Sequence, residues 1–327
     1  MYDVSPWEDE ARIAAIGRLA DEGDVGRLVD VLMLRAQDWH EGYGVASRLR
    51  AMPEEPRRAL ADRLVGHHNS PGGGPDQRER AVVLLALVAD GFVEEAWCDY
   101  WVRMLEDRAR HWYSTGTSDE VPAVAEAVLN AGRGLSWEVV GLLRRSAGQG
   151  LGWAGLLLDR LAEPLLNPGE PWADRILAEL PVLGERWRDL VAYLVAPKAG
   201  RPTRRWEREA AGRIDGIGAE AVRRRVTPWL ATAAQGGGQC DGGYDSYNVH
   251  VIIGLAWLMP LLPPHAETAR VLGALVEHAP VKAGVAGAGV HALARLEGGA
   301  GRVELARLAG CVDHKVTLKQ VRRALEV

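Results

Sequence analysis

The sequence predicts an all-α protein, and three observations support that prediction. Ala, Leu, Arg and Glu, which all favour helices, are abundant. Apolar residues recur with helical spacing along most of the chain, while alternating β-branched runs are scarce. Each predicted helix is short and apolar on one side, so neighbouring helices must stack to bury that side. Stacked helix pairs of about 40 residues are typical of HEAT- and armadillo-like repeats, and we therefore expect an α-solenoid.

The first part of the chain contains a series of such segments, separated mostly by Gly, Pro or Asn. Within Asp24–Ala36, apolar residues at positions 25, 28, 29 and 32 form one helical stripe. The clearest loop is Asn69–Pro75, because three consecutive glycines disfavour a helix. The helices expected here are one through Leu19 capped by Ser5 or Asp9, then Asp24–Ala36, Gly42–Met52, Glu54–His67, Gln77–Ala89, Val93–Arg110, and one through Leu129 capped by Ser118 or Asp119.

The rest of the chain continues the pattern. Ala196–Pro202 is predicted to be a linker, which divides the chain into an N-terminal helical region, 1–196, and a C-terminal HEAT-like module, 202–327. We expect the two to form one continuous solenoid. The helices expected here are Trp137–Arg145, Trp153–Leu166, Trp172–Leu180, Glu185–Leu194, two within Pro202–Leu230, and then Asn248–Leu262, Glu267–His278, Val285–Leu296 and Val303–Leu325.

Charge and cysteine usage restrict the function classes. The formal net charge of −5 argues against general nucleic-acid binding, although residues 201–225 carry eight Arg against four acids. Three cysteines without a CxxC pair fit a reducing compartment. The N-terminal residues lack the pattern of a signal peptide, and no apolar run reaches about 20 residues. We therefore expect a cytoplasmic protein that does not span a membrane.

No compact catalytic or metal-binding motif is present. The sequence contains no HExxH, GxSxG, GxGxxG or Walker-type loop. His67 and His68 adjoin a loop, but no Asp, Glu or Cys at suitable spacing completes a metal site. We expect no metal and no cofactor, and the absence of motifs favours a protein that is not an enzyme.

The aromatic residues supply the first candidate site. The chain has twelve Trp and one Phe, and most of the Trp occupy apolar helical positions where they would anchor helix pairs. The exception is a cluster near Arg108, Arg110 and Asp107 that consists of Trp97, Tyr100, Trp101, His111, Trp112 and Tyr113. Trp97 and Trp101 are four residues apart and share a helix face. Aromatic rings mixed with Arg at a helix end predict a binding groove.

Arginines supply the second candidate. Four of them recur at i, i+3, i+4 and i+7, on one face of a helix that begins early enough: Arg201, Arg204, Arg205 and Arg208. Together with Arg223–Arg225 they form either a phosphate-binding stripe or a solvated face with internal ion pairs to the acids nearby.

The glycine-rich segment Gln235–Tyr247 supplies the third candidate. The acidic neighbours of Cys240 would raise its thiol pKa, and no Lys is present to complete a phosphate cradle. The segment is therefore predicted to be a mobile loop. Loops that join solenoid helices often line a binding face, and we assign Tyr244 and Asn248 to such a face.

Residues 202–325 also carry a specific pattern. A Pro, a basic residue and a Trp precede a helix, an Ile-Gly turn and a second helix that ends in Trp-Leu, at Pro202, Arg205, Trp206, Ile217, Gly218, Trp229 and Leu230. The later matching positions are Asn248, Gly254, Leu255, Trp257, Gly289, Ala292, Leu293, Leu296, Leu305, Ala306, Leu308, Val312, His314, Lys315, Ala324 and Leu325.

This pattern resembles the helical segment of bacterial proteins related to the molybdate-metabolism regulator MolR, some of which also carry WGR domains. The resemblance implies a HEAT-like helical module without an assigned activity, and it supplies no catalytic residues. Ala283–Ala288 is shorter than the loop that the family tends to have before the Gly-x-x-Ala-Leu helix.

The sequence favours a non-enzymatic binding module whose concave face holds a protein or peptide partner. One alternative is a nucleic-acid-binding protein of the HEAT-like DNA-glycosylase type, using the arginine stripe. Another is an accessory or catalytic protein of a biosynthetic gene cluster.

Overall fold

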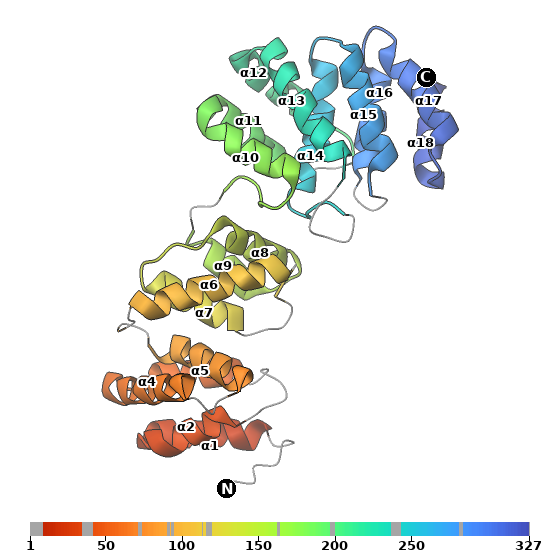
Figure 1. Cartoon of the computed structure of the whole chain (residues 1–327). Coiled ribbons are helices and arrows are strands. Elements are labelled where there is room, and N and C mark those ends of the chain that lie inside the picture. The colour runs from red at the N-terminus through yellow and green to blue at the C-terminus, as the bar shows by residue number, and fades with distance from the viewer. Residues whose placement is uncertain are drawn as a thin grey trace. The chain divides into compact units, whose positions relative to one another are not determined.

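The computed structural model is helical, which confirms the all-α class for the residues that it describes (Figure 1). No β-strand occurs within them. The described residues are 9–34, 42–70, 74–89, 92, 95–112, 114–115, 120–161, 164–196, 200–236, 243–280 and 284–326.

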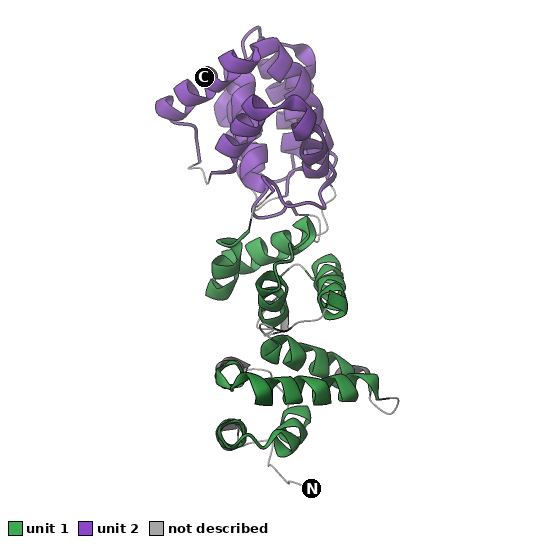
Figure 2. Ribbon diagram, turned by 90° about the vertical axis from the view of Figure 1, so that its left-hand side faces the viewer, with its two compact units in different colours: residues 1–162 green, residues 163–327 purple. Residues whose placement is uncertain are grey.

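The helices divide into two compact units, residues 1–162 and 163–327 (Figure 2). Each has its own hydrophobic core. The boundary lies after Ala162, whereas the sequence analysis placed it at 196–202. The physical reason is that Trp172 and Trp187, which precede the expected linker, bury their rings in the core of unit 2. That the two regions form one solenoid stays a prediction.

Unit 1 is built from short helices that pack on their neighbours in the chain and on the next helix but one. Thus α1 contacts α2 and α3, α2 contacts α4, α5 contacts α7, and α6 contacts α8. Figure 1 shows α4 and α5 side by side. The helices are α1 (Asp9–Glu22), α2 (Val25–Met33), α3 (Gly42–Ala51), α4 (Glu54–Asn69), α5 (Pro75–Val88), α6 (Glu95–His111), α7 (Glu120–Asn130), α8 (Trp137–Gly148) and α9 (Gly152–Leu158).

Unit 2 repeats this arrangement over its last six helices. There α13 contacts α15, α15 contacts α17, α14 contacts α16, and α16 contacts α18. The helices are α10 (Pro171–Leu183), α11 (Glu185–Val195), α12 (Arg204–Ile217), α13 (Ala219–Ala234), α14 (Val249–Leu258), the 3₁₀ turn η2 (Met259–Leu261), α15 (Ala266–His278), α16 (Val285–Arg295), α17 (Ala300–Cys311) and α18 (Lys315–Leu325).

Side-chain caps begin some of the helices. The Asp24 carboxylate accepts from the backbone N–H of Arg27 (3.2 Å) at the start of α2. The Thr203 hydroxyl accepts from the N–H of Trp206 (3.1 Å) at the start of α12. Each bond satisfies one of the free N–H groups of a first helical turn, which stabilises the helix by about 1 kcal/mol. The caps predicted at Ser5 and at Ser118 or Asp119 lie outside the described residues.

Three expected helices have different limits. The segment expected as Trp153–Leu166 ends at Leu158, and the chain then turns towards Pro164. Val303–Leu325 is two helices, because the chain leaves helical geometry at Val312–His314 before His314 caps α18. Asn248–Leu262 tightens into η2 at Pro260, where proline cannot donate a backbone hydrogen bond.

Candidate functional site

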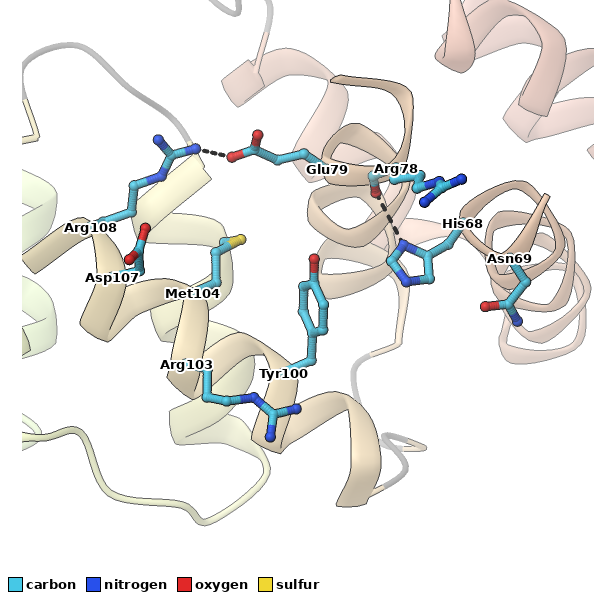
Figure 3. A pocket seen from close by; sticks show the side chains of 9 residues that line it. All are labelled: His68, Asn69, Arg78, Glu79, Tyr100, Arg103, Met104, Asp107 and Arg108. Atoms are coloured by element: carbon cyan, nitrogen blue, oxygen red, sulfur yellow. Dashed lines mark hydrogen bonds and ion pairs between the residues drawn. The ribbon is translucent and has the colours of Figure 1, made fainter. Parts of the chain in front are cut away.

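A surface pocket of about 850 Å³ lies in unit 1, where the end of α4 and the start of α5 meet α6 (Figure 3). Helix α6 forms one wall because its apolar face points elsewhere: Cys98, Trp101 and Leu105 are buried in the core of unit 1. The same helical period turns Tyr100 and Met104 towards the pocket. The packing of α6 against the core therefore places Tyr100 and Met104 in the pocket wall.

Aromatic rings line one side of this pocket. The His68 ring meets the edge or face of Trp97 at 5.4 Å and of Tyr100 at 5.5 Å, with interplanar angles of 73° and 81°. Trp97 and Tyr100 lie 6.3 Å apart, centroid to centroid. Such edge-to-face contacts are favourable for aromatic pairs. They fix the position of Tyr100, whose ring stands between Met104 and His68 in Figure 3.

Three charged groups of the pocket wall, Glu79, Asp107 and Arg108, have ion-pair partners within the protein. Arg108 forms an ion pair with Glu79, and its guanidinium lies 4.4 Å from the Trp112 ring centroid. Asp107 lies 3.6 Å from the Arg110 guanidinium and 3.5 Å from His111 Nδ1. These groups shape the wall and contribute little net charge to the pocket.

Two further guanidinium groups of the lining have no such partner. Arg78 and Arg103 line the pocket, and both are exposed. The backbone of Arg78 is engaged: its carbonyl oxygen lies 3.4 Å from His68 Nδ1, and its N–H donates to the Gly74 carbonyl oxygen (3.2 Å). Neither guanidinium makes an ion pair or hydrogen bond within the part of the chain that the structure describes. The pocket thus presents two free cations around an aromatic and apolar floor.

The structure separates the members of the predicted aromatic cluster. Trp97 and Trp112 are half-buried, and Arg108 lines the pocket. Trp101 is instead a core residue: its ring is fully buried, and its Nε1–H donates to the carbonyl oxygen of Val82 (3.3 Å). A ligand at the surface cannot reach it. Tyr113 lies outside the described residues.

Sequence reasoning missed the part of the pocket that comes from α4 and α5. His68 was considered only as a metal ligand, and Arg78 was not singled out. The available signal was the position of both residues beside the glycine-rich loop at 69–75, which joins two helices that must pack as neighbours.

The arginine stripe also contains residues of two kinds, one already paired within the protein and others exposed. Arg205 is paired with Glu209 (2.7 Å), and this hydrogen bond lowers the pKa of the Glu209 carboxyl. Arg204 and Arg208 are exposed on α12 with no ion pair among the described residues. Arg201 is also exposed, but it precedes the Thr203 cap and lies outside the helix. Three of the four arginines therefore remain available to a ligand.

Asn248 belongs to a buried polar network in unit 2. It is fully buried, its Oδ1 accepts from the N–H of Asn167 (2.8 Å), and its Nδ2 donates to the Asn167 carbonyl and to Glu170 (both 2.8 Å). Glu170 also accepts from the backbone N–H of Asp245 (3.0 Å). These bonds join the segment before α10 to the segment before α14, so Asn248 is a structural residue here, with no exposed surface for a ligand.

Burial changes the titration of this network. Desolvation raises the pKa of the Glu170 carboxyl, and the hydrogen bonds from Asn248 and Asp245 only partly oppose it. Tyr244 is half-buried, and its hydroxyl donates to the Ala233 carbonyl (3.1 Å). Burial, with a smaller contribution from Glu170, raises the pKa of Tyr244 to about 12. Cys240 lies outside the described residues.

Within the described residues, no group of three or more His, Cys, Asp or Glu side chains is placed to hold a metal ion. Among the helices described, none combines the length and the apolar character needed to cross a bilayer. The sequence matches no protein-family model and no curated protein.

Proposed function

We propose that this chain is a helical-repeat binding protein of HEAT-like, α-solenoid type, and that its unit 1 pocket holds a segment of a protein or peptide partner. The contacts between alternate helices within each unit support the repeat architecture, because stacked helix pairs bring every second helix into contact. Membership of the MolR-related family and a cytoplasmic location remain part of this proposal.

The pocket between α4, α5 and α6 is the observation that carries the binding role. Its volume of about 850 Å³ lies within the range of about 300–1,000 Å³ that is usual for ligand sites. Tyr100 and Met104 offer apolar contact, while Arg78 and Arg103 offer free donors. Aromatic and Arg side chains are the residue types that most often dominate binding energy at protein interfaces.

Selection of a displayed random-peptide library on the full chain tests the proposal. The Met104→Trp variant adds bulk inside the pocket, and Ala96→Trp adds the same bulk at an exposed position of α6 outside it. Peptides enriched on the wild-type chain are expected to lose binding to Met104→Trp and to retain it with Ala96→Trp. No enrichment, or equal binding to both variants, would contradict a peptide-binding pocket.

A second candidate function is nucleic-acid binding through Arg201, Arg204 and Arg208. The observation in its favour is that these exposed guanidiniums have no ion pair among the described residues. Phosphate contacts make binding fall steeply between about 50 and 200 mM salt. An Arg204→Ala/Arg208→Ala chain should then bind generic duplex more weakly than Arg205→Ala, which removes an arginine already paired with Glu209. No gel shift at low salt would exclude this function.

A further inference from the structure

We infer that the unit 1 pocket recognises an acidic peptide segment, in which carboxylate side chains flank an apolar one. This inference rests on the proposed function, because it names the chemistry of the partner that the pocket would hold.

The free charge of the lining is positive. The two acids that face the pocket, Glu79 and Asp107, are paired with basic side chains of the protein itself. Arg78 and Arg103 have no intramolecular acid to pair with in the described part of the chain. An arriving carboxylate therefore gains a charge-assisted hydrogen bond without breaking an existing ion pair. A basic segment would meet two unneutralised guanidiniums.

The floor between the two guanidiniums is suited to an apolar side chain. Tyr100 and Met104 lie one helical turn apart on α6, and Figure 3 shows Arg78 and Arg103 on opposite sides of the Tyr100 ring. The ring is held by its contacts with His68 and Trp97. Met adapts its shape to an apolar partner, and Tyr offers a rigid face. The lining therefore complements a peptide segment in which an apolar residue stands between two acidic residues.

The arrangement favours a peptide over a nucleic-acid strand. A nucleic-acid strand stacks successive bases on several aromatic side chains. Here Trp97 is engaged by His68 and the Trp112 face is covered by Arg108, which leaves Tyr100 as the ring that an incoming apolar side chain meets. Guanidinium groups bind carboxylates and phosphates alike through paired donors, but the net charge of −5 on the chain disfavours a long polyanionic strand.

Fluorescence polarisation on the full chain tests the inference with two labelled probes. One is Glu-Glu-Leu-Glu-Glu with glycine at each end, and the other replaces every Glu by Gln. We expect the acidic probe to bind about tenfold more tightly at low salt, as two charge-assisted contacts allow. Arg78→Ala/Arg103→Ala should abolish that preference, and Arg78→Lys/Arg103→Lys should keep part of it because charge remains while the planar donors are lost.

Arg63→Ala is the matched control, because Arg63 is an exposed arginine of α4 that does not line the pocket. It should bind both probes as the wild-type chain does. Equal affinity for the two probes, no measurable binding of the acidic probe, or an equal loss in the Arg63 variant would each overturn the inference. So would tighter binding of a single-stranded oligonucleotide that displaces the acidic probe.

The two proposals fail in different ways. If library peptides lose binding to Met104→Trp but carry no acidic residues and tolerate Arg78→Ala/Arg103→Ala, the pocket binds peptides and the acidic specificity is wrong. If no library peptide is enriched on the wild-type chain, the binding function itself is wrong. Circular dichroism and the urea midpoint of each variant show whether the chain is folded.

Discussion

In unit 1 the rings of His68, Trp97 and Tyr100 meet at the edge of a surface pocket, whereas in unit 2 the rings of Trp187 and Trp229 meet inside the core, 5.6 Å apart. The second unit continues this use of aromatics, because Trp206 contacts both Tyr193 and Trp257 across three helices. The same residue types therefore pack the core of unit 2 and form the edge of the proposed recognition pocket of unit 1. Aromatic content alone does not reveal a binding site; the neighbours of each ring do.

The largest expected effect compares one Trp from each unit. Trp229 is fully buried, and its Nε1–H donates to Glu179 (2.9 Å), so Trp229→Ala should lower the free energy of unfolding by about 4 kcal/mol. Trp97 is half-buried, and Trp97→Ala should cost about 1 kcal/mol. Urea unfolding followed by circular dichroism measures both. Equal losses would remove the distinction between core and pocket aromatics.

Asn248→Ala is expected to have the next largest effect. It removes three buried hydrogen bonds, two to the Asn167 backbone and one to the Glu170 carboxylate, which should cost about 3 kcal/mol. Asn130→Ala is the control, because Asn130 is exposed at the end of α7 and accepts a bond from Arg160. It should change stability by less than about 0.5 kcal/mol. A small loss at Asn248 would mean that water replaces the network.

Glycine substitutions compare the packing of the two units. In unit 2 a Cβ at Gly301 would lie 2.1 Å from the Leu293 carbonyl oxygen, so Gly301→Ala should cost about 2 kcal/mol as α17 shifts. In unit 1 the three atoms nearest to a Cβ at Gly17 all belong to the guanidinium of the exposed Arg48, which can rotate away. Gly17→Ala should therefore be neutral or slightly stabilising. Thermal unfolding of both variants checks this; a larger loss at Gly17 would contradict it.

The smallest expected effect is on the pH dependence of stability, through Glu170 of unit 2. Burial raises the pKa of Glu170 above its ordinary value of 4.5. The folded chain therefore binds more protons than the unfolded chain between these two values, and this contribution to stability is lost as pH rises through the folded-state pKa. Glu170→Gln should remove this pH dependence of stability. The measurement compares the free energy of unfolding of the variant and of the wild-type chain from pH 4 to 7. An unchanged or opposite slope would exclude Glu170 as its source.

The fold class and most helices could be predicted because helical period and glycine breaks are local properties of the sequence. The pocket could be predicted only in part. Arg108 and Trp97 were found because they belong to one helix, but His68 and Arg78 come from two other helices, and no local pattern shows that α4 and α5 meet α6. Trp101 and Asn248 were assigned to binding surfaces because burial depends on packing that adjacent residues do not specify.

Hydrogen–deuterium exchange of the full chain, with and without a saturating concentration of the Glu-Glu-Leu-Glu-Glu probe, tests the central claim most directly. If unit 1 recognises the partner and unit 2 uses its aromatics for stability, exchange should slow at the end of α4, the start of α5 and the middle of α6, and stay unchanged in residues 163–327. Protection confined to unit 2, or none in α4 to α6, would contradict the account.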